Sequence, residues 1–312
     1  MLFRSADAVR LGTEALRRAA EFSVWRQADV GPFTAMALHF LGRDEDATAV
    51  LDEVEPVAER VGHRQSQALC FRVRNFLAAR GPGFPDAQLR FVADDHERIA
   101  GLLGGSWTAD SEAQAAVADF WAGDWDRARE HAANSQGGAF YWVWNPAYPA
   151  IQMLIAAYDG DIEAAKAAFK MVENDRPIPG QSATVGAWSA YVNVVEALIL
   201  VGEKEKAAAL RPILQHIIDV GAVSLGYTFR LVQLAAGLAA WADGDFDAAE
   251  AHLAQAEADA AMRRDEVQAA DIKRFRAMML LDRPSEVDGR AARELLEAAA
   301  VLGDEDQGLA IG

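Results

Sequence analysis

Two acidic strings resemble the start of a calcium-binding loop: Asp243-Gly244-Asp245-Phe246-Asp247 and Asp159-Gly160-Asp161-Ile162-Glu163. Such a loop also needs glycine at its sixth position and glutamate at its twelfth. Counted from Asp243, those positions hold Ala248 and Ala254. We therefore interpret the acids as residues that begin helices, where they meet free backbone N–H groups and the positive end of the helix dipole.

Other residue types that carry chemistry lack their usual companions. The run Asp94-Asp95-His96-Glu97 would need a second histidine at position 100 to resemble a zinc-protease motif, and Ala100 stands there. Cys70 lies in an apolar stretch, where a buried and inert thiol is expected. The sequence contains no phosphate-binding loop and no nucleophile elbow. We therefore expect no catalytic residue, no metal and no cofactor in this chain. The remaining histidines are scattered singly.

A group of aromatic residues is the best candidate for a binding site, because aromatic and arginine side chains dominate binding hot spots. They open three successive predicted helices, so they could line one groove for a protein or peptide partner. The alternative is that the rings fill the core, as aromatic residues at helical spacing usually do. Full burial of most of these rings would favour that alternative. The predicted partner-binding residues are Tyr141, Trp142, Trp144, Tyr148, Trp188, Tyr191, Tyr227 and Arg230.

A repeated turn organises the elements that would position these residues. A glycine is followed three residues later by an acid and five residues later by an alanine, and the pattern returns about every 40 residues. A looser copy stands at Gly81, and an expanded copy lies around residues 283–292. A fixed period of this length is typical of helical repeat arrays. The repeat glycines are Gly42, Gly123, Gly160, Gly202 and Gly244, and the matching alanines are Ala47, Ala128, Ala165, Ala207 and Ala249.

Each part of the turn has a physical reason. Glycine ends the first helix, because the residue after a helix often needs a positive φ. The acid begins the second helix. The alanine is small where two helices cross closely, and a large apolar residue such as Trp121 or Trp241 precedes the glycine. One hairpin cannot bury its apolar face alone, so we expect neighbouring hairpins to stack.

The combination of small residues in the first helix with Gly244-Asp245-Phe246-Asp247-Ala248-Ala249 at the turn resembles tetratricopeptide-type repeats. The longer period and residues 276–300 are similar to the C-terminal tails of bacterial proteins that carry a cyclase or DNA-binding regulator domain with an ATPase domain. The resemblance implies an all-α, right-handed solenoid of about seven helical hairpins across residues 1–312. It also implies a non-catalytic regulatory arm of a larger signalling protein, whose head domain lies outside this chain.

Two other functions stay open. The chain could be a free-standing scaffold that binds a partner peptide, or an enzyme built on an α/α toroid. The toroid would need acids beside the aromatic residues at the mouth of a central pocket, whereas the acids of this sequence cluster at the repeat turns.

Composition limits the environment and the partners. The 312 residues carry a formal charge of −17, which disfavours direct binding to nucleic acid or to an anionic membrane. A single cysteine excludes a disulfide framework and suits the cytoplasm. Apolar residues make up 52% of the chain, with no run long enough to span a membrane and no signal peptide. We therefore expect a cytoplasmic protein.

Proline and glycine set the expected boundaries. Residues 1–30 are interpreted as a partial hairpin, residues 303–312 as a frayed or truncated tail, and residues 174–182 as a longer loop. The first complete hairpin is expected from Pro32 to Gly62, and further helices over residues 86–103 and 227–242. Pro212 marks a possible kink in the helix that starts at Lys204.

Overall fold

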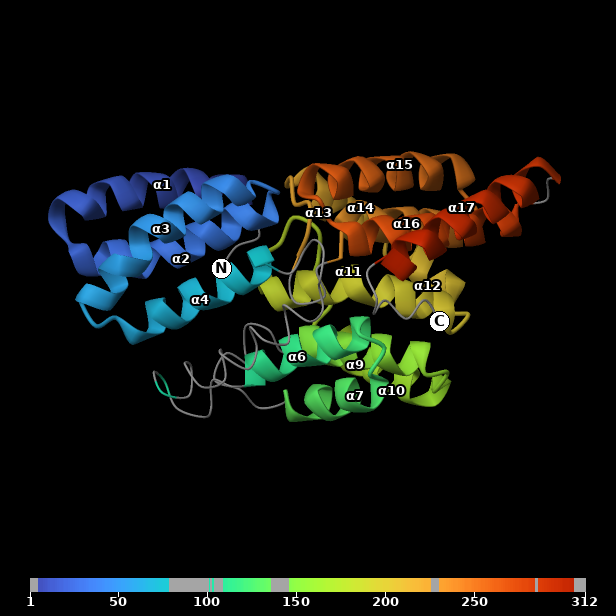
Figure 1. The fold of residues 1–312 in the computed structure, drawn as a ribbon, viewed down its shortest axis with the longest axis horizontal. Coiled ribbons are helices and arrows are strands. Elements are labelled where there is room, and N and C mark those ends of the chain that lie inside the picture. Colours follow the sequence, from blue (N-terminus) through green and yellow to red (C-terminus); the bar gives the residue numbers. More distant parts are fainter. Residues whose placement is uncertain are drawn as a thin grey trace.

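The structure, a computed structural model, describes residues 5–78, 101, 103, 109–135, 146–225, 230–283 and 286–305. These residues are almost entirely α-helical (Figure 1), and a single bridge between Ser224 and Leu231 is their only β-type pairing. The first block holds α1 (Ser5–Phe22), α2 (Val24–Phe40), α3 (Asp44–Arg60) and α4 (Arg64–Ala78). The remaining helices are α6 (Ala109–Trp121), α7 (Trp125–Asn134), α9 (Ala147–Tyr158), α10 (Ile162–Glu173), α11 (Val185–Leu200), α12 (Lys204–Ala208), α13 (Arg211–Asp219), α14 (Val232–Ala242), α15 (Phe246–Arg263), α16 (Glu266–Asp282) and α17 (Glu286–Glu305).

The repeat turn has one backbone conformation at all five glycines. Their φ angles lie between 73° and 78°, in the left-handed region that glycine tolerates best. The N–H of Gly123 donates to the carbonyl of Phe120, and the next N–H, of Asp124, donates to Asp119. This is the Schellman arrangement, which satisfies the last carbonyls of a helix.

Acids begin the second helix of these hairpins by capping it. The side chains of Asp124, Asp161 and Asp245 each accept a hydrogen bond from the backbone N–H three residues further on. The alanine five residues after each repeat glycine is fully buried. The same six residues of sequence, from the repeat glycine to the alanine, therefore end one helix, begin the next and permit their close crossing.

Ion pairs join the turns at Gly160, Gly202 and Gly244 to the hairpin before each of them. Arg129 of α7 pairs with Asp159 at 2.6 Å, and Lys166 of α10 pairs with Glu203 at 3.2 Å. Arg211 of α13 holds both acids of the following turn, Asp243 and Asp245. Each pair is partly exposed and contributes little alone. Together they form a ladder, defined by these three basic residues and their acids, along one edge of the stacked hairpins.

The helices pack in two sets. α9 lies between α10 and α11, and α11 in turn packs against α14, so the first helices of successive hairpins lie side by side. α7, α10 and α15 each pack against their own first helix. Some contacts depart from this order: Tyr158 at the end of α9 meets Arg274 of α16, and the turn between α2 and α3 meets residues 221–224 and the end of α15. Within the described parts of the chain, no helix combines the length and apolarity needed to cross a membrane.

Several helix boundaries differ from the sequence-based expectation. α2 begins at Val24 because Ser23 caps it, and Pro32 lies inside the helix rather than at its start. Pro212 does not kink a continuous helix; it stands in the first turn of α13, where its missing N–H costs no helical bond. α14 begins at Val232, after the Ser224–Leu231 bridge, rather than at residue 227. The expected turn at Gly81, most of the helix over 86–103, and residues 306–312 of the expected tail lie outside the described residues.

The repeat glycines offer a matched pair of substitutions. At Gly244 an added Cβ meets nothing within 4 Å, so Gly244→Ala should cost only the left-handed backbone strain, about 1–2 kcal/mol. At Gly42 the same Cβ would lie 3.3 Å from Val223 and 3.4 Å from Met262. We therefore expect Gly42→Ala to lower the free energy of unfolding more than Gly244→Ala does, measured by urea denaturation. Equal losses at the two positions would show that the α2–α3 turn is not held against residue 223.

Candidate functional site

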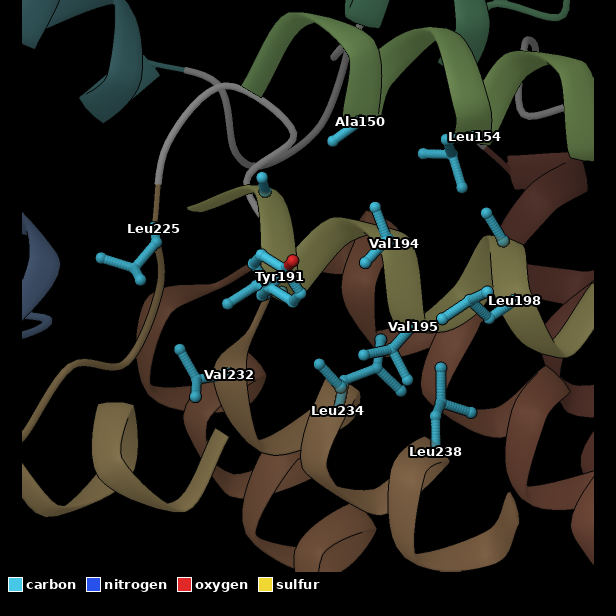
Figure 2. Packing of buried hydrophobic residues seen from close by; sticks show 14 of the residues in the cluster. Ala150, Leu154, Tyr191, Val194, Val195, Leu198, Leu225, Val232, Leu234 and Leu238 are labelled. Atoms are coloured by element: carbon cyan, nitrogen blue, oxygen red, sulfur yellow. The ribbon is translucent and has the colours of Figure 1, made fainter. Parts of the chain in front are cut away.

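The aromatic residues predicted to bind a partner fall into two groups. Tyr148 of α9 and Trp188 and Tyr191 of α11 are buried, with at most 1% of each side chain exposed. Figure 2 shows Tyr191 among the buried residues of the core, together with Val232 and Leu234 of α14. These three rings therefore belong to the core, the alternative that the sequence left open, and they present no surface to a partner in this conformation. Tyr141, Trp142, Trp144 and Tyr227 lie outside the described residues, and their role stays a prediction.

The burial of these rings follows from the position of α11. Every residue from Val185 to Ile199 is buried, so the helix is enclosed on all sides rather than along one stripe. An aromatic residue at the start of such a helix meets a neighbouring helix whichever way it points. A groove along the first helices would have to be lined by other residues.

Arg230 is also buried, but it has a different role from the three rings. It lies in a group of five polar side chains that we call the inner ion cluster: Tyr158, Glu196, Arg230, Asp271 and Arg274. One Arg230 nitrogen lies 2.6 Å from a Glu196 oxygen, and the other contacts Asp271. Arg274 reaches Asp271 at 3.0 Å and Glu196 at 3.5 Å. The Tyr158 hydroxyl donates to Glu196 and accepts from Arg274.

The cluster joins elements that are far apart in sequence. Tyr158 ends α9, Glu196 lies in the second half of α11, Arg230 precedes α14, and Asp271 and Arg274 are one turn apart on α16. The Arg230 guanidinium also lies 4.3 Å from the centre of the Trp121 ring at the end of α6, a cation–π distance. Four hairpins and the helix that follows them thus share one buried set of charges.

Two arginines balance two carboxylates in this cluster. Burial raises the pKa of Glu196 more than the nearby Arg230 lowers it, and the Asp271 charge raises it further. Burial also acts to raise the pKa of Asp271, but Arg230 and Arg274 outweigh it, so this pKa lies below its usual value. Burial raises the pKa of the Tyr158 hydroxyl well above its usual value, and the two carboxylates add to that shift. Tyr158 is therefore a hydrogen-bond donor at neutral pH.

The cluster is suited to holding helices in register rather than to proton transfer. Both acids are already bound by guanidinium groups, and a buried ion pair is stable only while all partners stay in place. Removing or displacing one member leaves an unpaired charge in the interior. If a ligand or a domain movement shifts one of these helices, the other helices of the cluster must therefore move with it.

Sequence reasoning missed this cluster, although a signal was present. Glu196 is the only charged residue in α11, and a charged residue almost never lies in so apolar a helix without a partner. This rule predicts that Glu196 has a polar or charged partner. It does not identify Arg230 or Asp271 as its partners, because their proximity depends on how three hairpins stack.

A smaller polar group joins α6 to α7. The His131 ring lies between two carboxylates, with Nδ1 2.6 Å from Glu112 and Nε2 3.4 Å from the fully buried Asp119. Burial raises the pKa of Asp119, with Arg127 and His131 acting against it. Each ring nitrogen of His131, a histidine without an obvious partner in the sequence, thus lies near a carboxylate. Among the residues that the structure describes, no group of three or more histidine, cysteine or acidic side chains is arranged to hold a metal ion.

Open hollows on the described surface include the following two. One, of about 270 Å³, lies between α13, α14 and α15 and is lined by Arg211, Leu214, Gln215 and His252 among others. The other, of about 320 Å³, is mainly apolar and lies between α1 and α2, beside the exposed Leu11. Neither contains a member of the inner ion cluster.

Comparison with known proteins gives no identification. No protein-family model matches this chain, and no match was found among curated proteins.

The two acids of the cluster should respond differently to neutralisation. Asp271→Asn removes the charge that two arginines share, and breaking a buried pair in this way costs about 3–5 kcal/mol. Glu196→Gln keeps the shape of a residue whose neutral form burial already favours, so we expect a smaller loss. Urea denaturation of both variants measures the difference. If Glu196→Gln proves the more damaging, the assignment of the stable negative charge to Asp271 is wrong.

The contribution of Asp271 should also depend on pH. Its pKa is lower in the folded chain than in the unfolded chain, so its stabilisation is present above the unfolded value and is lost as pH falls through the folded value. The gap in melting temperature between the wild type and Asp271→Asn should therefore be widest near neutral pH and should narrow below about pH 4. Asp126→Asn, which alters a carboxylate that is 90% exposed, is the control and should show no comparable gap.

Proposed function

We propose that this chain is a non-catalytic interaction and regulatory module, a right-handed solenoid of about seven tetratricopeptide-like hairpins. In this proposal it forms the C-terminal arm of a bacterial signalling protein whose head is a cyclase or a transcriptional regulator with an ATPase domain. The resemblance of the turn Gly244–Ala249 and of residues 276–300 to such tails supports the context. The cytoplasm is the compartment that fits this role.

One observation carries the mechanism: the inner ion cluster connects the first helices of successive hairpins. Because Glu196, Arg230 and Asp271 come from three different parts of the stack, a tilt of any hairpin that carries one of them changes the distances among them. A partner that binds several hairpins would bias the curvature of the array, and the array would bias an attached domain. The partner is a protein, a peptide or the head itself; the charge of −17 makes nucleic acid an unfavourable ligand.

The enzyme alternative gains little support from the site. Glu196 and Asp271 do lie beside aromatic rings, as an α/α toroid would require, but both carboxylates are bound by guanidinium groups. A general acid or base must be free to exchange a proton with a substrate. The free-standing scaffold differs from the regulatory arm only in whether a head domain is attached.

The DNA sequence upstream of the first codon in the source genome tests the context directly. A reading frame that continues into a phosphate-binding loop and a cyclase or regulator domain would support the regulatory arm. A stop codon and a ribosome-binding site immediately upstream would contradict it and would favour the free-standing scaffold, for which a search for peptide ligands becomes the next experiment.

If a head domain is present, the cluster should influence its activity. We expect Arg230→Met in the complete protein to change the basal activity of the head by several-fold, because it removes one of the two guanidinium groups that the buried carboxylates Glu196 and Asp271 share. Arg17→Met is the control, since Arg17 is exposed and pairs only with Glu14 and Glu21 on its own helix among the described residues. Equal activity of the two variants, with the fold of Arg230→Met verified by circular dichroism, would contradict the proposed coupling.

A further inference from the structure

A contact between distant parts of the chain departs from the nearest-neighbour order of stacked hairpins. The N–H of Val223 donates to the carbonyl of Phe40 at 2.7 Å, which joins the segment before α14 to the end of α2. Arg263, the last residue of α15, donates to the Ser224 hydroxyl at 2.7 Å and lies 3.6 Å from the Asp44 carboxylate. We call these five residues the docking contact. In a simple repeat array each unit touches only its neighbours, so this contact is an additional constraint.

The docking contact is buried and polar, which makes it selective. The Arg263 side chain is only 3% exposed, and its charge lies beside the Asp44 carboxylate and the Ser224 hydroxyl across the boundary between α15 and the α1–α4 block. Asp44 also lies 2.9 Å from His39, within that block. Separation of the block would leave the Arg263 charge without the carboxylate that it meets there. Partly separated arrangements of the docking contact are therefore unstable, so the contact is either formed or broken.

The same short segment links the docking contact to the inner ion cluster. Ser224 and Leu231 form an antiparallel bridge, and the N–H of Val232 donates to the carbonyl of Val223 at 2.9 Å. Arg230 directly precedes Leu231 and carries its guanidinium into the cluster. The N–H of Val223 thus donates to Phe40, while its carbonyl accepts from Val232, the first residue of α14 and two residues after the cluster arginine.

We propose that docking of the α1–α4 block and closure of the inner ion cluster are coupled through the Ser224–Leu231 bridge. The block acts as a built-in effector: when docked, it fixes residues 223–224, and the bridge fixes Arg230 between Glu196 and Asp271. When the block leaves, the bridge loses one support and the cluster loosens. This switch goes beyond the proposed function, because it is internal to the chain and needs no partner or head domain.

The test alters a residue of the inner ion cluster and measures amide hydrogen exchange in the docking contact, and then makes the reverse comparison. Glu196→Gln weakens the pairing of Arg230 within the inner ion cluster, and amide hydrogen exchange reports on the Val223 N–H in the docking contact. We expect exchange at Val223 to be roughly 5-fold or more faster than in the wild type, the lower range of measured couplings between sites. In the opposite direction, Arg263→Met should accelerate exchange at Val232, because coupling between two sites is reciprocal.

Arg74→Met is the matched control. Arg74 pairs with Asp52 and Glu55 inside the α1–α4 block, so its loss disturbs that block without touching residues 221–231 in the described structure. It should leave exchange at Val232 unchanged. Circular dichroism must show wild-type helicity for each variant, and chemical denaturation must show that global unfolding is too rare to explain the exchange. Unchanged exchange at Val223 in Glu196→Gln, or equal acceleration by Arg74→Met and Arg263→Met, would overturn the proposal.

Discussion

The fold depends on neutralising one buried charge, the guanidinium of Arg230. An arginine remains charged at any physiological pH, so its burial requires carboxylates at fixed positions. Glu196 and Asp271 supply them from α11 and α16, and the Trp121 ring of α6 covers the guanidinium. The apolar packing between these helices is compatible with many small rotations. The inner ion cluster is compatible with few such rotations, because its hydrogen bonds need fixed distances. It therefore selects one arrangement of hairpins from those that hydrophobic burial would allow.

The structure of the repeat turn was predictable from the sequence, because the turn involves residues only a few positions apart. The glycine at Gly160, the acid at Asp161 and the alanine at Ala165 each follow from the requirements of ending, starting and crossing helices. The ladder of ion pairs was not predictable in the same way. Asp159 has an obvious local role next to its helix end, and only the stacking distance between hairpins shows that Arg129 reaches it.

The direction of side chains in the enclosed helices was the hardest feature to predict. α11 is apolar along nearly its whole length, so its sequence has no polar stripe to show which face meets solvent. The sequence therefore left both a groove and the core open for Trp188 and Tyr191, with the core as the usual place for such rings, and the structure places both in the core. Long-range polar contacts share this difficulty: nothing near Asp44 in the sequence points to Arg263.

The two sets of buried charges differ in what they constrain. The inner ion cluster relates helices of one continuous stack, from α9 to α16, so it refines an arrangement that the apolar core has largely determined. The docking contact relates the α1–α4 block to the segment before α14, which the stacking of hairpins alone does not bring together. A repeat array without such a contact would bend gradually, since its stability is a sum over neighbouring interfaces. A contact that closes between distant units turns gradual bending into a choice between two states, which is the property that a regulatory arm requires.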